Sequence, residues 1–418
     1  MNFDDAVSYL LSLGHETLTI KLGLTNTEAL LAALGKPHKS FPSVQIAGTN
    51  GKGSTAVMLE SICREAGIRV GLFTSPHLIS ITERIRIDGC EISESEFARL
   101  TQHVKQAAEE LLARGDLQTL PTFFEHVTAI ALLAFREANV ELAILETGLG
   151  GRLDSTTAAG ANIVAITQIA MDHQEYLGHS LTEIAAEKAA IIRSGVKAIV
   201  APQTIEAMRV MSARCAEVGV TPCLVRADRC EKMKLGLRGR HQFVNAATAM
   251  ALAEALREQG LKISQEAIVR GLEHTNYSGR LELWEGQPPI LFDGAHNPAA
   301  ARALRDYLDE FVSQPVIMIF GAMRDKALKE IAAILFPAAR EVILTELDNP
   351  RSATIAQLRA AASAGSDQAQ LHEAKSAEEA LRVARKLAHA DGLILVTGSL
   401  YLVGAARKSG LAHNQPAK

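Results

Sequence analysis

The sequence has no excess of basic residues, because 43 Lys and Arg stand against 47 Asp and Glu, a formal net charge of −4. Proteins that hold nucleic acid by its phosphates carry a basic surface, so we expect no nucleic-acid partner. Apolar runs long enough for a transmembrane helix are missing, and the acidic start MNFDDAVSYLLSLG is unlike a signal peptide. We therefore expect a cytoplasmic protein without a membrane partner.

Cysteine is scarce, and its spacing excludes the usual frameworks. The five cysteines include no CxxC pair, and their odd number is not typical of a disulfide-bonded scaffold. We interpret them as reduced core residues: Cys63, Cys90, Cys215, Cys223 and Cys230. What remains is an ordinary globular composition, 48% hydrophobic and 22% charged over 418 residues, long enough for roughly two to three domains.

Short β-branched runs alternate with stretches of helical period along most of the chain. Such an alternation predicts parallel sheets covered by helices. The predicted strands are 44–47, 69–73, 141–146, 163–167 and 197–200, then 290–292, 316–320, 342–345 and 393–397; the predicted helices include 54–66, 123–138 and 181–193. We predict an α/β protein, with a P-loop ATPase-type parallel-sheet domain at 1–280 followed by a smaller Rossmann-like α/β domain at 281–418.

A glycine-rich segment, GTNGKGST at 48–55, follows the first predicted strand. Its match to the G-x-x-x-x-G-K-[ST] pattern is imperfect, because Ile46 occupies the first glycine position and Gly53 separates Lys52 from Ser54. A plain glycine-rich turn is the alternative. The strand–loop–helix context and Lys52 favour a phosphate site for ATP or a similar nucleotide, with a hydroxyl from Ser54 or Thr55.

Two polar residues follow neighbouring predicted strands. Glu146 ends a very apolar strand and precedes three glycines, so it is placed to hold Mg²⁺ on nucleotide phosphates; an ordinary strand-end glutamate is the alternative. His173 follows the next strand. Its position leaves three roles open: metal ligand, hydrogen-bonding residue or loop surface.

Lys188 lies on the apolar stripe of a predicted helix. Ser180 and Glu183 form a capping-box pattern that opens this helix, and the 3.6-residue period places Lys188 on the same face as Ile184 and Ile191. Either the lysine extends along the surface to solvent, or burial lowers its pKa. A neutral amine can react with carbon dioxide to give an anionic carbamate, which could bind metal.

Several motifs together resemble one family. They are GTNGKGST, TSPHL with ITERIRIDG, ETGLGGRLD, DHQEYLG, Glu187-Lys188, HQFVNA, Gly279-Arg280, DGAHNP and TGSLYLVG. In this order they resemble the folylpolyglutamate synthases of the Mur ligase superfamily, and most of all the bacterial bifunctional dihydrofolate synthase/folylpolyglutamate synthases. The resemblance spans nearly the whole chain.

The resemblance implies an ATP-dependent acid–amino-acid ligase. In that family a carboxylate takes the γ-phosphate of ATP to form an acyl phosphate, and L-glutamate then displaces phosphate. The implied substrates are ATP, L-glutamate, dihydropteroate and reduced folates. The implied ions are Mg²⁺ and, as an additional candidate, a monovalent cation. The family also implies a monomer, with a Mur-ligase-type ATP-binding domain and a C-terminal ligase domain.

The resemblance also assigns roles to residues. The catalytic set would be Lys52, Glu146, His173 and Lys188, the last as N6-carboxylysine, and the metal ligands Ser75, Glu146 and His173. The ATP contacts would be Asn50, Gly51, Lys52, Gly53, Ser54, Asn245, Arg280 and Asp293. The pterin or folate contacts would be Gly14, His15, Glu16, Thr122, Phe123, Phe124, Leu153, Asp154 and Ser155; for 121–125, packing at a helix start is the alternative.

Four positions depart from the family pattern and three alternatives stay open. Thr147 and Thr157 stand where Val and Asn are expected, Ala327 stands where an acidic residue is common, and Ala189 stands where glycine often follows the lysine. The glutamate site is therefore not assigned. The alternatives are a folylpolyglutamate synthase alone, a Mur-type ligase with another acceptor, and a nucleotide switch without ligation. The 47 residues before Gly48 would be too few for the extra N-terminal domain of the peptidoglycan ligases.

Overall fold

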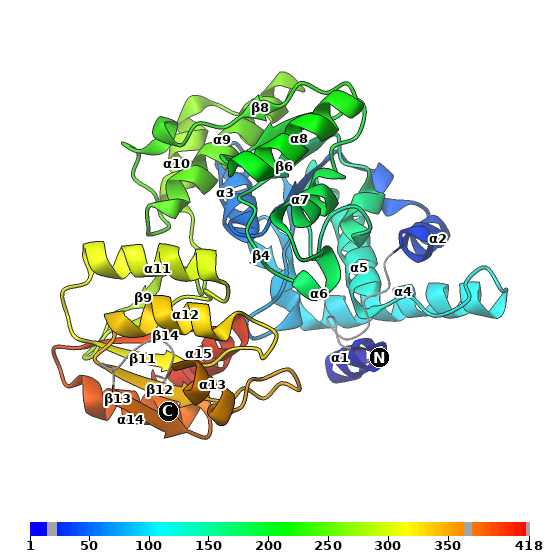
Figure 1. Ribbon diagram of the computed structural model, residues 1–418. Coiled ribbons are helices and arrows are strands. Elements are labelled where there is room, and N and C mark those ends of the chain that lie inside the picture. Colours follow the sequence, from blue (N-terminus) through cyan, green and yellow to red (C-terminus); the bar gives the residue numbers. More distant parts are fainter. Residues whose placement is uncertain (15–22, 363–369, 415–418) are drawn as a thin grey trace. The chain divides into compact units, whose positions relative to one another are not determined.

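The computed structural model describes residues 1–14, 23–362 and 370–414. They form two compact units, the first made of Met1–Gly236 with Phe243–Thr275, and the second of Leu237–Gln242 with Asn276–Lys418. Each unit contains its own sheet (Figure 1). In the part of the chain that is described, no helix is both long and apolar enough to cross a membrane.

The sheet of the first unit has the strand order β4-β3-β2-β5-β1-β6-β7-β8 over the described residues. Pairing is parallel from β2 to β8, whereas β3 and β4 are antiparallel additions at one edge. The strands are β1 (Ser43–Ala47), β2 (Val70–Phe73), β3 (Ile85–Ile87), β4 (Cys90–Glu91), β5 (Leu142–Glu146), β6 (Ile163–Ile166), β7 (Lys197–Val200) and β8 (Cys223–Leu224).

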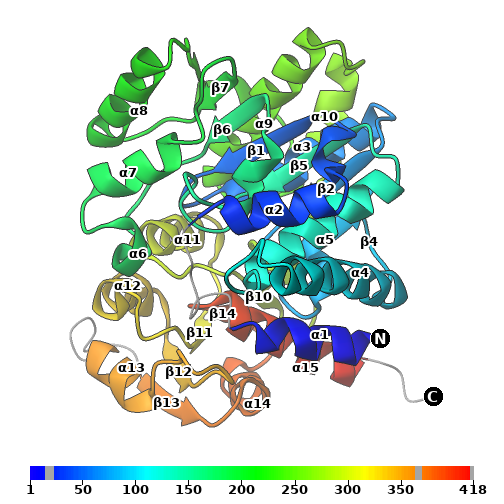
Figure 2. The same cartoon turned by 90° about the vertical axis from the view of Figure 1, so that its right-hand side faces the viewer.

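The helices of this unit cover both faces of the sheet. They are α1 (Phe3–Ser12), α2 (Thr25–Ala33), η1 (Pro37–Lys39), α3 (Lys52–Glu65), η2 (Ile81–Arg84), α4 (Glu94–Ala113), α5 (Phe123–Glu137), η3 (Ser155–Ala159), α6 (Gln174–Leu177), α7 (Leu181–Ala189), α8 (Ile205–Glu217), η4 (Ala227–Cys230), α9 (His241–Glu258) and α10 (Gln265–His274). α3 packs on β1, β2 and β5 with α10 beside it, while α4 and α5 lie side by side and α5 contacts β2 (Figures 1 and 2).

Continuous burial explains why the central strands are mostly apolar. Every residue of β1, β2, β5 and β6 is buried, as expected for parallel strands covered on both faces. α7 is shorter than the predicted helix 181–193, because it ends at Ala189 and the chain turns at Ala190. Ile191 and Ile192 remain buried in the core with α7 and α8, so their apolar pattern reflects packing rather than helix.

The second unit has the strand order β13-β12-β11-β14-β10-β9 over its described residues, parallel except for β9. The predicted α/β class with a larger first and a smaller second part is therefore confirmed. Its elements are β9 (Glu282–Trp284), β10 (Ile290–Phe292), α11 (Pro298–Phe311), β11 (Val316–Phe320), α12 (Leu328–Leu335), η5 (Phe336–Ala338), β12 (Glu341–Thr345), α13 (Ile355–Ala362), β13 (Gln370–Ala374), α14 (Ala377–Ala388), β14 (Leu393–Thr397) and α15 (Leu400–Asn414).

The cysteines are free thiols, but the prediction that all are core residues is wrong for two of them. Cys63, Cys215 and Cys230 are buried. Cys90 and Cys223 are exposed, because each lies on a two-residue strand at an edge of the first sheet, where one side has no neighbouring strand to cover it.

Candidate active site

The glycine-rich loop joins the carboxyl end of β1 to the N-terminus of α3. Gly51 precedes α3 in a left-handed conformation with φ of 88°, and a Cβ there would fall 2.2 Å from Asn245 Oδ1. Only glycine fits this approach. Gly51 has no side chain that could cap the first N–H groups of α3, and an uncapped helix N-terminus suits an anion.

The functional side chains of this loop lie where the helix begins. The Lys52 Nζ donates to the Thr49 carbonyl at 3.2 Å, and the loop backbone is held because Thr49 N and Asn50 N both donate to Gln168 O. Gly53 and Ser54 are buried in the first turn of α3. The Thr55 hydroxyl, also buried, has no hydrogen-bond partner within the described residues. This arrangement can hold a phosphate chain.

The carboxyl ends of the neighbouring strands β2 and β5 bring two predicted metal ligands together. Glu146 is only 4% exposed, and its Oε2 accepts a hydrogen bond from Ser75 N at 3.1 Å. A carboxylate and a serine hydroxyl are hard oxygen donors of the kind that Mg²⁺ prefers, so this pair fits a magnesium ion. Among the described residues, however, no group of three or more His, Cys, Asp and Glu forms a ready metal cluster.

His173 follows β6, the strand on the other side of β1. It precedes α6 in a left-handed conformation, its N–H donates to Asp172 Oδ1 at 2.9 Å, and its Nε2 lies 3.9 Å from Asp172 Oδ2. Asp172 is buried whereas the His173 side chain is partly exposed. The buried carboxylate therefore holds the backbone of His173, and the imidazole lies near that carboxylate at the same edge of the sheet.

Lys188 does not extend to solvent. Its side chain is buried, 4% exposed, and Nζ donates to the carbonyl oxygen of Gly48 at 2.9 Å. Burial lowers the pKa of Lys188 to about 7; nearby Lys52 acts in the same direction, and Asp172 and Asp154 oppose it. A lysine with this pKa has a substantial neutral fraction near pH 7, and the neutral amine is the form that reacts with carbon dioxide.

The predicted pterin contacts at 122–124 open helix α5. Thr122 caps the helix in a capping box with Glu125, and Phe123 is buried beneath the Arg84 guanidinium, 5.3 Å from the ring centroid. Phe124 is partly exposed and lies against Gly148, whose added Cβ would stand 2.5 Å from the ring. Phe124 also packs against the core, with its ring centroid 5.8 Å from that of Phe73, so helix-start packing remains the alternative for all three residues.

Asp154 organises the loop that follows Glu146. One carboxylate oxygen accepts from Gly148 N and Leu149 N, both at 3.0 Å, and the other accepts from Thr156 N and its hydroxyl. Burial raises the pKa of Asp154, and these hydrogen bonds oppose that rise. Leu153 is partly exposed and Ser155 is buried. Gly14 directly follows α1 and its connecting turn, but the predicted contacts His15 and Glu16 lie outside the described residues.

The remaining predicted ATP contacts are distributed over both units. Asn245 lies on α9 beside Gly51 in the first unit. In the second unit Asp293 is buried and accepts from Leu281 N and Ala295 N, while Arg280 lies over the Tyr277 ring. Burial raises the pKa of Asp293, and the charges of Arg280 and His241 oppose this.

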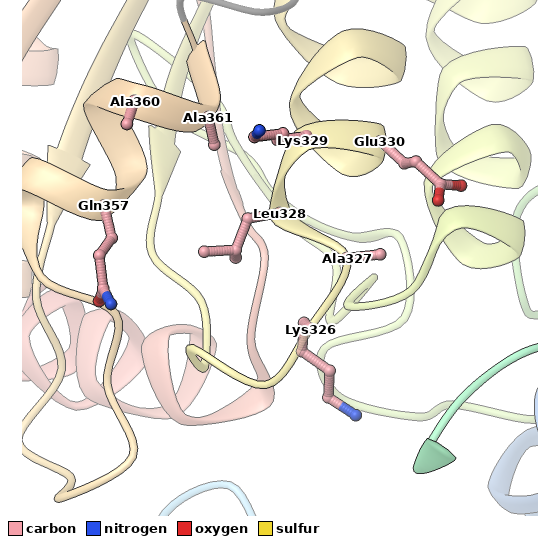
Figure 3. A pocket seen from close by; sticks show the side chains of 8 residues that line it. All are labelled: Lys326, Ala327, Leu328, Lys329, Glu330, Gln357, Ala360 and Ala361. Carbon is pink, nitrogen blue, oxygen red and sulfur yellow. The ribbon is translucent and has the colours of Figure 1, made fainter. Parts of the chain in front are cut away.

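A pocket of about 380 Å³ in the second unit lies between α12 and α13 (Figure 3). It is lined by residues 326–330 with Gln357, Ala360 and Ala361. Figure 3 shows Leu328 extending toward the α13 side, whereas Glu330 points away. Ala327, which departs from the family pattern, is in this lining, but none of the predicted site residues within the described chain is.

Sequence analysis missed Gln45, Thr156 and Asp172. Gln45 is a buried amide in the middle of β1, and the only available signal was a polar residue inside an apolar strand. The capping box at the start of α5 was also missed, although the sequence contains its signal, a Thr-x-x-Glu spacing before an apolar run. Asp172 begins the DHQEYLG motif, but nothing in that motif indicated its contacts with His173.

Comparisons with known proteins agree with these features. The family description "Mur ligase middle domain" matches residues 46–221, and "Mur ligase, glutamate ligase domain" matches residues 279–400. The dihydrofolate synthases/folylpolyglutamate synthases of Bacillus subtilis and Escherichia coli are 33% and 35% identical to this chain. Each alignment covers 97% of this chain, with 98% of the Bacillus protein and 96% of the Escherichia protein.

A longer relative also matches. The probable bifunctional folylpolyglutamate synthase/dihydropteroate synthase of Halobacterium salinarum is 35% identical over 97% of this chain, and the chain spans about half, 51%, of that protein's length. Among solved structures, Mycobacterium tuberculosis folylpolyglutamate synthase with ADP and AMPPCP has a TM-score of 0.88 at 31% identity, covering 99% of this chain and 100% of that one. Escherichia coli FolC with DHPP and ADP has a TM-score of 0.86 at 31% identity, covering 99% of each chain.

Proposed function

The chain belongs to the dihydrofolate synthase/folylpolyglutamate synthase family of Mur ligases, and on this premise we propose that it is an ATP-dependent ligase that adds L-glutamate to dihydropteroate and to reduced folates. The observation that carries the proposal is the edge of the first sheet. There the glycine-rich loop and the Ser75–Glu146 contact follow the neighbouring strands β1, β2 and β5, and the buried Lys188 amine of α7 donates to the Gly48 carbonyl of that loop. Phosphoryl transfer from ATP to a carboxylate requires groups that bind the phosphates and offset their negative charge, and these residues can supply them.

The first chemical step would be attack of an acceptor carboxylate oxygen on the γ-phosphorus of ATP. The bond from that phosphorus to the bridging oxygen breaks, ADP leaves, and an acyl phosphate forms. Lys52 and the open N-terminus of α3 would offset the charge that spreads over the phosphate oxygens. Proposed ATP contacts also come from Asn50, Gly51, Gly53, Ser54 and Asn245 in the first unit and from Arg280 and Asp293 in the second.

The second step would join glutamate to the acceptor. The glutamate amino nitrogen attacks the acyl carbon, the carbon–oxygen bond to phosphate breaks, and an amide forms as the amine loses a proton to solvent. The phosphate leaves from the same loop that received it. Phe124 lies on α5 beside Gly148, a residue of the loop that Asp154 holds. Its flat ring would be available to a pterin.

Ser75, Glu146 and His173 would hold Mg²⁺, and a monovalent cation is an additional proposed ligand. Magnesium bound there would supply positive charge to the nucleotide phosphates. We propose that Lys188 acts as a carbamate, whose anionic oxygens would join this charge arrangement; its burial against Gly48 O and its pKa of about 7 support this role. We also propose a monomer of cytoplasmic location.

The test is phosphate release from ATP with L-glutamate, run in parallel with dihydropteroate and with a reduced folate, with product masses determined. We expect both acceptors to be glutamylated. Glu146→Gln, which keeps the side-chain shape but removes the charge, should lower kcat by roughly 100-fold or more while the circular dichroism spectrum is unchanged.

The outcomes separate the alternatives. Reaction of the reduced folate alone would reduce the proposal to a folylpolyglutamate synthase. If neither acceptor supports phosphate release, the result would contradict the folate proposal and favour a Mur-type ligase with another acceptor. An unaltered kcat and magnesium dependence in Glu146→Gln would refute the ligand role of Glu146.

A further inference from the structure

A buried amide lies under the loop that carries Asp154. Gln45, in the central strand β1, is 0% exposed, and its Nε2 donates to the hydroxyl oxygens of Thr156 at 3.0 Å and Thr157 at 2.7 Å. A third, longer contact of 3.3 Å reaches Thr147. Burying an amide in the middle of a parallel sheet is costly unless its hydrogen bonds are made, so this arrangement calls for a reason.

Each of the two threonine hydroxyls already donates its proton to another acceptor. Thr156 Oγ1 donates to Asp154 Oδ1 at 2.5 Å, and Thr157 Oγ1 donates to the Gly151 carbonyl at 2.7 Å. A hydroxyl has one proton, so both oxygens can only accept from Gln45. The amide NH₂ group supplies the two donors that they need, and this fixes which way the amide faces. An ionised glutamate at this position would place carboxylate oxygens, which only accept hydrogen bonds, against two threonine oxygens that can also only accept.

This orientation of the amide has an energetic cost at its carbonyl oxygen. Gln45 Oε1 is buried and finds no hydrogen-bond partner among the described residues. Reversing the amide would satisfy neither threonine oxygen. The protein therefore keeps one unpaired carbonyl in order to hold two hydroxyls.

From these hydroxyls the hydrogen bonds continue to the loop backbone. Asp154, held by Thr156, accepts from the N–H groups of Gly148 and Leu149. Thr157 holds the Gly151 carbonyl at the other end of the same loop. Gln45 thus anchors both ends of the 148–151 segment to the strand that leads into the phosphate loop.

We propose that Gln45, acting through Thr156 and Thr157, is a positioning residue that sets the geometry of the 148–154 loop for the carboxylate-bearing acceptor. The acceptor's identity rests on the proposed function; the hydrogen-bond relay does not. The relay also gives a structural reason for Thr157, which departs from the family pattern, because Gln45 and the Gly151 carbonyl are both bonded to its hydroxyl.

The experiment compares matched variants of the full chain by hydrogen–deuterium exchange and by steady-state kinetics. Gln45→Met removes both donors, and Thr156→Val removes one relay hydroxyl at nearly constant shape, so it remains informative if Gln45→Met fails to fold. Thr156→Ser keeps the hydroxyl. Thr101→Val makes the same chemical change at a buried threonine of α4, whose hydroxyl donates to Phe97 O at 2.7 Å and has no contact with the relay among the described residues.

We expect the amides of Gly148 and Leu149 to exchange about tenfold faster in Gln45→Met and Thr156→Val, with little change in the 49–55 loop. The KM for the acceptor should rise about tenfold in both variants, while the KM for ATP stays within about twofold. Thr156→Ser and Thr101→Val should behave like the wild type.

Unchanged exchange at Gly148 and Leu149, or equal acceleration throughout the first unit, would overturn the relay. Faster loop exchange with an unaltered acceptor KM would overturn its positioning role. If the wild type ligates neither acceptor, the proposed function fails, and the exchange pattern of the four variants still decides whether the relay holds the loop.

Discussion

At the scale of single residues, Lys188 has the most unusual environment of the proposed catalytic set. Its amine is removed from water and donates to the Gly48 carbonyl, with the charge of Lys52 close enough to oppose protonation. With a pKa of about 7, protonation below this pH produces an ammonium that cannot attack carbon dioxide. Above it the neutral amine dominates, so carbamate formation should increase with pH through this range.

This gives a pH prediction for Lys188. In protein equilibrated with ¹³C-bicarbonate, a carbamate NMR resonance should grow between pH 6 and pH 8, and ligase activity should rise with it. The resonance should be missing in Lys188→Arg, which retains a positive charge but no reactive amine. An active wild-type enzyme without a carbamate resonance at pH 8 would contradict the prediction.

Residue roles could be predicted only where chemistry follows local sequence. The helical period correctly placed Lys188 on the apolar face, but it could not supply Gly48 O as its partner, since 140 residues separate the two. Likewise Gln45 gives no local signal of its purpose, because its partners Thr156 and Thr157 come from a segment more than 100 residues away.

At the scale of elements, the hydrogen bonds that fix the start of α5 also fix the position of Phe124, a residue of the proposed acceptor site. Thr122 accepts from Glu125 N while Glu125 Oε2 accepts from Thr122 N, and Glu125 Oε1 accepts from the Thr27 hydroxyl of α2. Helix α5 therefore begins at a fixed point directly before Phe124. The capping box sets where the aromatic side chain is presented.

Removing the cap should loosen this start. Thr122→Ala should destabilise the first unit by about 1 kcal/mol, because an N–H of the first turn loses its acceptor. We expect a melting temperature lower by a few degrees, measured calorimetrically, with Thr122→Ser close to the wild type. Equal melting temperatures for Thr122→Ala and Thr122→Ser would show that the hydroxyl does not stabilise α5.

Elements were predictable where burial is continuous and missed where it is not. The apolar runs of β1, β5 and β11 are buried along their whole length and were identified within one residue of their bounds. Strand β13 was missed because it lies at a sheet edge and carries exposed and partly exposed polar residues, including Gln370 and Glu373. Two-residue strands such as β8 are too short for a period to be visible.

At the level of the whole molecule, each unit contains a largely parallel sheet covered by helices, and most of the functional candidates lie near the ends of its strands. The first contains the phosphate loop, Glu146 and Lys188, and the second contains Arg280 and Asp293. The alternating strand–helix pattern was sufficient to predict this class. The glutamate site was not predictable, because nothing in the spacing of residues distinguishes an amino-acid pocket from a surface depression such as the one beside Ala327.

The central claim is that this chain activates a carboxylate as an acyl phosphate and then joins it to glutamate. It is tested most directly with dihydropteroate carrying ¹⁸O in its carboxylate, by mass spectrometry of the phosphate and of the pterin product. We expect each phosphate released to carry one ¹⁸O, with one amide formed for each phosphate. Phosphate free of ¹⁸O, or released without glutamylated product, would contradict it.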